Sequence, residues 1–111
     1  MQDIALEDLK IEERPGCVAE ALSILGNKWT ALIVMELSKG CGRFSALEHT
    51  LSGISPRTLS QRLDDMQDKR LITKKAFAEV PPRVEYTLTD KGRDLLPILK
   101  SMACWGEKYG Q

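Results

Sequence analysis

The sequence of 111 residues predicts a single α+β domain that is mainly helical and carries one small β-hairpin. Apolar residues recur every three to four positions along most of the chain, which is typical of amphipathic helices. Two short segments within residues 71–88 look like strands instead, the second of which alternates apolar and polar residues, and Pro81-Pro82 separates them. With 42% apolar residues, a chain of this length is expected to build one modest hydrophobic core.

Two helices are expected on either side of Gly26. Leu22 and Leu25 follow helical spacing, and Gly26 then ends the segment. Asn27 can cap the next helix, in which most positions up to Leu37 are apolar. This second helix is therefore expected at the centre of the core.

A short third helix is expected after a turn at residues 39–42, where two glycines can adopt positive φ. Ser45 and Glu48 have the spacing of a capping box, so Ser45 is the expected N-cap. Ser52-Gly53-Ile54 ends this helix after about two turns.

The fourth helix is expected to begin at Ser55-Pro56, with serine as the N-cap and proline at the first helical position. It should run to about Lys69. Three residues at helical spacing form its narrow buried stripe: Leu59, Leu63 and Met66. The outward face then carries Arg57, Gln61, Asp64 and Asp68.

Residues 71–77 and 83–88 read as two strands joined by an extended loop at residues 78–82. Lys74 and Lys75 lie on the first strand, and Arg83 is expected at the base of the second. This basic hairpin could reach along a neighbouring phosphate backbone or minor groove.

A last helix is expected from Asp90, capped by Thr89, with Pro97 kinking it at a cost of about 3 kcal/mol. It carries a broad apolar stripe that something must cover, and a second copy of the chain is the expected cover. The expected dimer-interface residues are Leu95, Ile98, Leu99, Met102 and Trp105.

Helix, short helix, turn, helix and basic hairpin, in this order, are expected of a winged helix-turn-helix, a unit that reads DNA. Arg57 can donate two hydrogen bonds to guanine, and Gln61 can pair with adenine. The expected DNA-contacting residues are Arg43, Ser45, Ser55, Pro56, Arg57, Thr58, Ser60, Gln61, Arg62, Lys74, Lys75 and Arg83. The expected partner is double-stranded operator DNA.

The net charge is zero, but the charges are unevenly placed. Residues 1–20 hold six acidic and two basic residues, whereas residues 21–62 hold five basic and two acidic ones. The acids at positions 64, 65 and 68 lie at the far end of the fourth helix, so they would limit how deeply it enters a groove.

Several classes of function are not indicated. The three cysteines have no Cys-x-x-Cys spacing, so neither a metal site nor a disulfide framework is expected. No set of nucleophile, base and orienting residue is visible, so neither catalysis nor a cofactor is expected. The acidic N-terminus and the absence of a long apolar run favour a cytoplasmic protein without a membrane partner.

Five motifs together resemble the HxlR-type transcriptional regulators of the MarR-like superfamily. They are Gly26-Asn27-Lys28-Trp29 and the segments 43–47, 54–63, 80–86 and 87–92. The resemblance covers about residues 17–106 and implies a bacterial, homodimeric winged helix-turn-helix protein that binds an inverted-repeat operator. Asn27 departs from the family's usual glycine and Val18 from its usual proline.

The same resemblance makes Cys17 a candidate redox sensor, because some relatives sense oxidants or electrophiles through an N-terminal cysteine. Cys17 is also expected near a helix N-terminus, where the dipole favours a thiolate. An oxidant or a small molecule is thus a candidate signal. Residues 1–16 are expected to form an acidic extension, and residues 17–111 the winged domain.

One alternative function remains open, namely a winged-helix module that binds protein through the same surface. Binding to DNA weakens steeply with salt because counterions are released, whereas a mostly apolar protein contact does not. The salt dependence of binding therefore distinguishes a DNA-binding protein from a protein-binding module.

Overall fold

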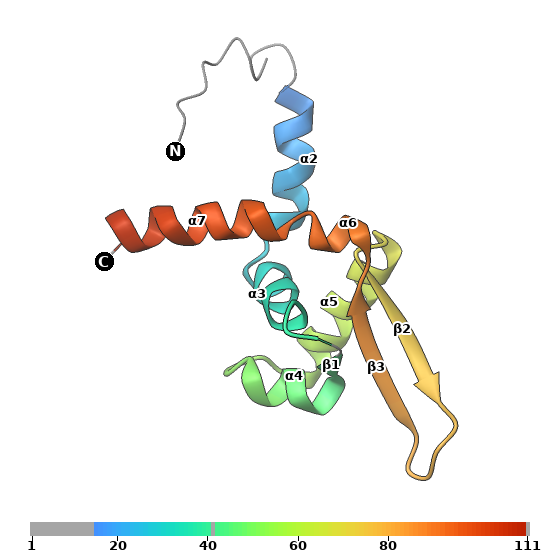
Figure 1. Ribbon diagram of the computed structural model, residues 1–111. Coiled ribbons are helices and arrows are strands. Elements are labelled where there is room, and N and C mark those ends of the chain that lie inside the picture. The colour runs from blue at the N-terminus through green and yellow to red at the C-terminus, as the bar shows by residue number, and fades with distance from the viewer. Residues whose placement is uncertain (1–14, 41, 111) are drawn as a thin grey trace.

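The computed structural model describes residues 15–40 and 42–110 and confirms the α+β class (Figure 1). The expected acidic extension lies almost entirely outside the described residues. The elements are α2 (Pro15–Leu25), α3 (Lys28–Leu37), β1 (Gly42–Arg43), α4 (Phe44–Thr50), α5 (Pro56–Asp68), β2 (Ile72–Phe77), β3 (Arg83–Leu88), α6 (Asp90–Arg93) and α7 (Leu96–Tyr109).

Helix α3 is the central helix, as the sequence predicts. Asn27 caps it, because the side-chain oxygen of Asn27 accepts hydrogen bonds from the backbone N–H groups of Trp29 at 2.9 Å and Thr30 at 3.2 Å. Ile33 and Val34 are fully buried. Burial of one such aliphatic side chain contributes about 1.5–3 kcal/mol, so α3 anchors the core.

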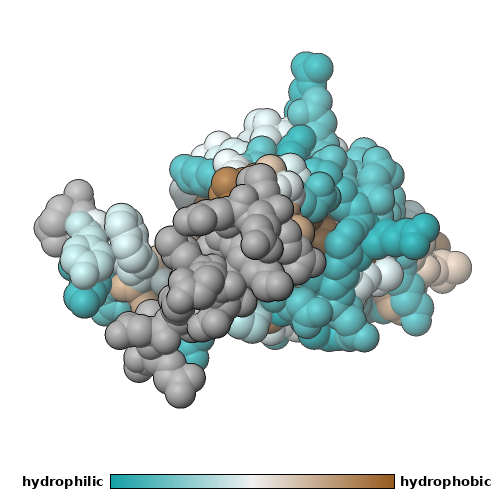
Figure 2. Space-filling model, turned by 90° about the horizontal axis from the view of Figure 1, so that it is seen from above, coloured by the Kyte–Doolittle hydropathy of each residue, from teal (hydrophilic) through white to brown (hydrophobic). Residues whose placement is uncertain are grey.

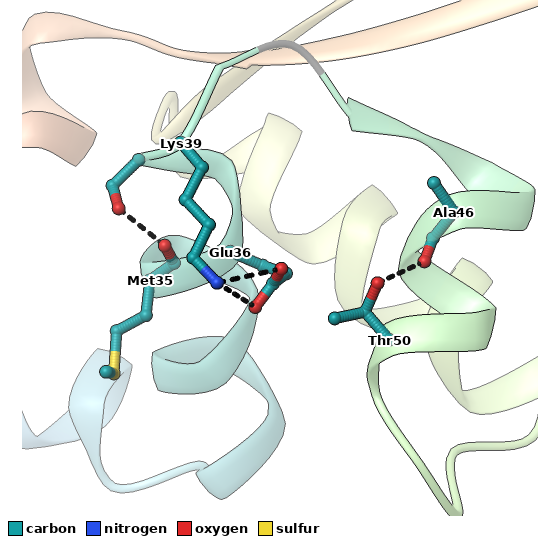
Figure 3. Close-up of polar contacts among 6 residues, drawn as sticks. Met35, Glu36, Lys39, Ala46 and Thr50 are labelled. Carbon is teal, nitrogen blue, oxygen red and sulfur yellow. Dashed lines mark hydrogen bonds and ion pairs between the residues drawn. The ribbon is translucent and has the colours of Figure 1, made fainter.

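Helix α4 begins earlier than the sequence predicts, and the capping box at Ser45 is wrong. The N-cap is Arg43, which makes no capping hydrogen bond with its side chain, and Ser45 lies inside the first turn. The reason is that Gly42 and Arg43 pair with β3, so the helix starts directly from this short strand. Within α4, the Thr50 hydroxyl donates to the Ala46 carbonyl at 2.6 Å (Figure 3).

Helix α5 confirms the predicted pattern. Ser55 is its N-cap, Pro56 is its first residue, and the helix ends at Asp68. The three residues of the predicted stripe are at most 1% exposed and contribute to the main core: Leu59, Leu63 and Met66.

The hairpin belongs to a three-stranded antiparallel sheet in the order β1-β3-β2. In the register, Gly42 faces Tyr86, Arg43 faces Glu85, and Phe77 faces Arg83. Arg83 is the first residue of β3, as expected, and it therefore lies beside the hairpin loop. The strand β1 was not expected, because two residues carry no detectable alternation.

The C-terminal segment forms two helices instead of one kinked helix. Helix α6 ends at Arg93, and Pro97 lies in the first turn of α7. A proline costs little there, because the first N–H groups of a helix have no intrahelical acceptor. The expected kink of about 3 kcal/mol is therefore wrong.

No single helix among the described residues is both long and apolar enough to cross a bilayer. Helices α2 and α3 pass that test only as a pair, and they are bent by 75° at the break between them. Buried helices of a folded core commonly have such a composition, and α3 is one of them.

Figure 1 shows how these elements divide the molecule. Helix α4, the first half of α5 and the hairpin loop lie at the bottom, whereas α2 and α7 lie at the top. From above, the C-terminal part of α7 stands apart from the rest of the molecule (Figure 2). The end of the molecule that holds α4, the start of α5 and the hairpin loop is thus separate from the end that holds α2 and α7.

Candidate nucleic-acid interface

The N-terminus of α5 is held in place by its own cap. The Ser55 hydroxyl oxygen accepts from the backbone N–H of Thr58 at 3.1 Å and donates to the Thr58 hydroxyl at 2.9 Å. Both hydroxyls are thus engaged in fixing the first turn, and Pro56 is exposed beside them. The cap orients the residues that follow.

Arg57, Ser60 and Gln61 are exposed on the first half of α5, on the side opposite the buried stripe. No hydrogen bond or ion pair to any other described residue engages these three side chains. The guanidinium of Arg57 and the amide of Gln61 are therefore free to bind an external partner. Both lie in the first half of α5, and Figure 1 shows that this end of the helix is the one nearer α4.

Arg62 lies in a different environment. Its guanidinium is 3.6 Å from the Asp65 carboxylate, which also lies 3.2 Å from the Lys69 ammonium. Asp65 is thus neutralised by one cation within α5 and one at its C-cap, and the Arg62 side chain is only 27% exposed. Of the predicted contacts on α5, Arg62 is the one with an internal partner for its charge.

The two hairpin lysines point to opposite faces of the sheet, because side chains alternate along a strand. Lys74 faces Tyr86, on the side that carries the core residues Ile72 and Leu88. Lys75 faces Glu85 on the other side, and its ammonium lies 5.1 Å from the centre of the Phe77 ring. Both lysines are exposed.

Arg83 is the most constrained of the predicted contacts. Its guanidinium lies 3.2 Å from Glu85, 3.5 Å from Glu79 and 4.0 Å from the Phe77 ring centre. Its Nε is buried and makes an ion pair with Glu85, but the geometry is not that of a hydrogen bond. Two carboxylates therefore surround this cation.

Arg43 and Ser45 are exposed at the start of α4. Arg43 belongs to β1, which leads into α4, and its guanidinium lies 3.9 Å from Glu85 of the neighbouring strand β3. A groove of about 500 Å³ separates the start of α4 from the hairpin loop. Its lining residues are Arg43, Phe44, Ser45, Glu79, Val80, Pro81, Pro82, Arg83 and Val84. An arginine therefore stands on each side of this groove.

Glu85 is the residue that the sequence analysis missed. It contacts both Arg43 and Arg83 and faces Lys75 across the sheet. The regular alternation of β3 places it on the outer face, but only the pairing with β1 brings Arg43 to it. No local pattern in the sequence predicts the pairing of β1 with β3.

One titratable side chain of the sheet is perturbed. The pKa of Tyr86 is raised above its usual value of 10.0, first because the phenol is buried and second because Asp64 of α5 lies nearby. The phenol therefore stays neutral over the ordinary pH range and packs as a core residue.

The predicted interface residues of the last helix fall into two groups. Leu95 and Leu99 are 9% and 5% exposed and belong to the core of their own chain. Ile98, Met102 and Trp105 are 45–65% exposed, as is Tyr109 of the same face, 60% exposed. The second group forms an apolar face that the described part of the chain leaves uncovered.

Cys17 on α2 and Cys104 on α7 are free and exposed, whereas Cys41 lies outside the described residues. Among residues 15–40 and 42–110, no cluster of three His, Cys, Asp or Glu side chains is arranged to hold a metal ion.

Comparison with known proteins bears on this arrangement. A family model described as HxlR-like helix-turn-helix matches residues 24–111. A protein named as a helix-turn-helix-type transcriptional regulator of Methanothermobacter thermautotrophicus is 36% identical over 104 residues, which is 94% of this chain and 79% of that protein.

Two solved structures extend the likeness to the fold. A protein of Porphyromonas gingivalis W83, assigned to the MarR family of transcriptional regulators, superposes with a TM-score of 0.79 at 38% identity, over 83% of this chain and 90% of that one. The oxidised form of the redox regulator HypR gives 0.77 at 32% identity, over 82% and 94%. Winged-helix regulators thus share this chain's fold.

Proposed function

Because the chain belongs to the HxlR-like helix-turn-helix family of transcriptional regulators, we propose that it binds double-stranded operator DNA as a homodimer. In this proposal α5 enters the major groove, and the hairpin lies along the neighbouring backbone or minor groove.

The main observation behind the proposal is that the side chains of Arg57 and Gln61 are exposed and make no hydrogen bond or ion pair with other described residues. A long polar side chain that is exposed and has no partner in its own chain can pair with a base edge without first breaking another contact. Both residues lie on the half of α5 that begins at Ser55, close to α4. Arg57 would read guanine and Gln61 adenine.

The distribution of acids on α5 supports the same orientation. Asp65 is paired with Arg62 and Lys69, and the exposed Asp64 and Asp68 lie three and seven residues beyond Gln61. The end that would meet DNA carries no acid between positions 55 and 62. Repulsion by phosphate would act only on the far end of the helix.

The partner surface in the dimer is assigned to the exposed face of α7. Ile98, Met102 and Trp105 are the proposed contacts, and Leu95 and Leu99 would support them from within the core. A two-fold dimer would present two α5 helices to inverted half-sites about one helical turn, roughly 34 Å, apart.

The salt dependence of binding tests the proposal. Association with a fluorescent duplex selected from genomic fragments is measured between low and physiological salt. The DNA reading predicts a steep loss of affinity, because each neutralised phosphate releases about one counterion. No enrichment of any duplex, or a protein partner bound with little salt dependence, would support the protein-interaction alternative instead.

We also infer that oxidation regulates binding, and the exposure of Cys17 and Cys104 favours this. HypR, a similar protein, is named a redox regulator. Two exposed thiols on α2 and α7 could join neighbouring subunits as a disulfide. Diamide treatment and non-reducing electrophoresis should show a linked dimer that is lost in Cys17→Ser; a linked dimer that persists in that variant would exclude Cys17.

We assign the chain no catalytic activity and no cofactor, since the relatives that it matches are named as transcriptional regulators. A DNA-binding regulator acts where the chromosome lies, so the cytoplasm is the expected compartment.

A further inference from the structure

The outer face of the three-stranded sheet carries a group of charges centred on one carboxylate. Glu85, in the middle of the central strand, lies 3.2 Å from Arg83 and 3.9 Å from Arg43. Lys75 faces it from β2. The Glu85 side chain is only 21% exposed, so water screens these interactions less than at an open surface.

The two arginines of this group differ in how firmly they are held. Arg83 contacts two carboxylates and the Phe77 ring and is 26% exposed, so it is a support of the hairpin end. Arg43 has Glu85 as its ion-pair partner and is 57% exposed. Arg43 is therefore the arginine of this group that a phosphate could reach, and Glu85 is the group from which the phosphate would have to attract it.

A carboxylate at the centre of a DNA-binding face should lower the affinity for DNA. It repels phosphate and partly neutralises the arginines on either side of the groove between α4 and the hairpin. A neutral residue at position 85 would give stronger attraction for any DNA. Glu85 nevertheless contacts both Arg43 of β1 and Arg83 of β3, which sets the separation of the two arginines.

We propose that Glu85 is a positioning residue that determines specificity. It withholds the charge of Arg43 from arbitrary phosphates and releases it only when α5 and the hairpin are both seated on the preferred duplex. This inference rests on the proposed DNA-binding function. Under this inference, Glu85 contributes to specificity without touching a base. It does so by lowering the affinity for duplexes of the wrong sequence.

The test compares Glu85→Gln, which removes the charge and keeps the shape, with the unmodified chain. Two probes are used: the duplex that the unmodified chain selects best from a randomised 30-base-pair pool, and an unselected random duplex. For Glu85→Gln, affinity for the random duplex should rise about tenfold, and the slope of log affinity against log salt should steepen by about one. Affinity for the selected duplex should change much less, so the ratio of the two affinities should fall.

A double-mutant cycle shows whether Glu85 acts through Arg43. In an Arg43→Gln background, Glu85→Gln should no longer raise affinity for the random duplex, because the released cation is absent. A matched control is Glu36→Gln. Glu36 lies on α3 and is a similarly half-buried carboxylate, 23% exposed, whose oxygen lies 3.3 Å from the Lys39 ammonium (Figure 3). The Glu36→Gln substitution removes the same charge at a position away from the sheet.

The outcomes separate the inference from the function on which it rests. If Glu85→Gln and Glu36→Gln change both affinities by the same factor, or if the Arg43→Gln background leaves the gain intact, the inference is wrong while DNA binding stands. If the unmodified chain enriches no duplex, the function fails and the inference with it. If Glu85→Gln does not fold, Glu85→Asp replaces it, because the shorter side chain keeps the charge but withdraws it from Arg43. Affinity for the random duplex should then rise by a smaller factor. An unchanged ratio of the affinities for the selected and the random duplex would contradict the inference.

Discussion

The carbonyl oxygen of Leu71 occupies the space beside Gly92 that a Cβ atom would need. Gly92 lies in α6, and Leu71 immediately precedes β2, so this contact joins the last part of the domain to the hairpin. The Leu71 carbonyl also accepts from the N–H of Thr89 at 3.0 Å. Neither backbone can move away without breaking that bond.

Gly92→Ala should therefore lower the free energy of unfolding by about 2 kcal/mol or more, because the methyl group collides with backbone. Gly106→Ala in α7 is the matched control, since a Cβ there meets no atom within 4 Å. It should be neutral or stabilising by about 0.5–1 kcal/mol. Urea unfolding measures both; equal losses would contradict the close approach.

Arg70 has a positive φ of 61°, a conformation that costs a non-glycine residue about 1 kcal/mol. It follows the C-cap of α5, where glycine is the favoured residue. Arg70→Gly should raise the free energy of unfolding by up to about 1 kcal/mol. Gln67→Gly, within the last turn of α5, should lower it by a similar amount. A loss in both variants would show that the Arg70 side chain matters more than its backbone.

Stability should decline at alkaline pH through Tyr86. Its raised pKa means that the unfolded chain loses this proton near pH 10 before the folded chain does. The contribution of the neutral phenol is therefore complete below pH 10 and is lost as pH rises through the folded pKa. Tyr86→Phe should show a weaker decline in unfolding free energy between pH 9 and pH 11. An identical decline would assign it to other groups.

Arg57 and Lys75 should affect DNA binding in different ways. Arg57→Ala removes a proposed base contact, so it should cost about 1–3 kcal/mol on the preferred duplex and relax one base preference. Lys75→Ala removes a proposed phosphate contact, so it should weaken all duplexes alike and reduce the salt slope by about one. Fluorescence anisotropy on matched duplexes distinguishes them, and uniform effects of both variants would reject this assignment of α5.

Self-association should depend on the exposed face of α7. Trp105→Lys places a charge among Ile98, Met102 and Tyr109, so light scattering should show a fall in mass toward that of a single chain. Glu107→Lys changes the charge on another side of the same helix and should leave the mass unchanged. If both variants keep the mass of the unmodified protein, this face is not the interface.

Local sequence patterns were sufficient wherever one segment decides its own structure. The cap at Asn27, the start of α5 at Ser55 and the buried stripe of α5 all follow from neighbours within a few residues. Ser45 failed as an N-cap because a distant strand pairs with Gly42 and Arg43 and starts α4 earlier. Pro97 failed as a kink because the chain had already left the helix at Asp94.

The candidate site divides in the same way. The exposure of Arg57 and Gln61 follows from the helical period alone, since Leu59 and Leu63 face inward. The surroundings of Arg83 do not, because they depend on the register of β3 against two strands. A carboxylate that links β1 to the hairpin, as Glu85 does, can be recognised only after long-range pairing is known.

The end of α6 at Arg93 and the new start of α7 at Leu96 also bear on how such regulators diverge. Among the described residues, Leu99 is the last core residue, and nearly all side chains beyond it are exposed. In the proposed dimer, substitutions after Leu99 would alter which chains associate while the proposed DNA-contacting residues stay unchanged. After a gene duplication, two copies could stop mixing their subunits before their operators diverge.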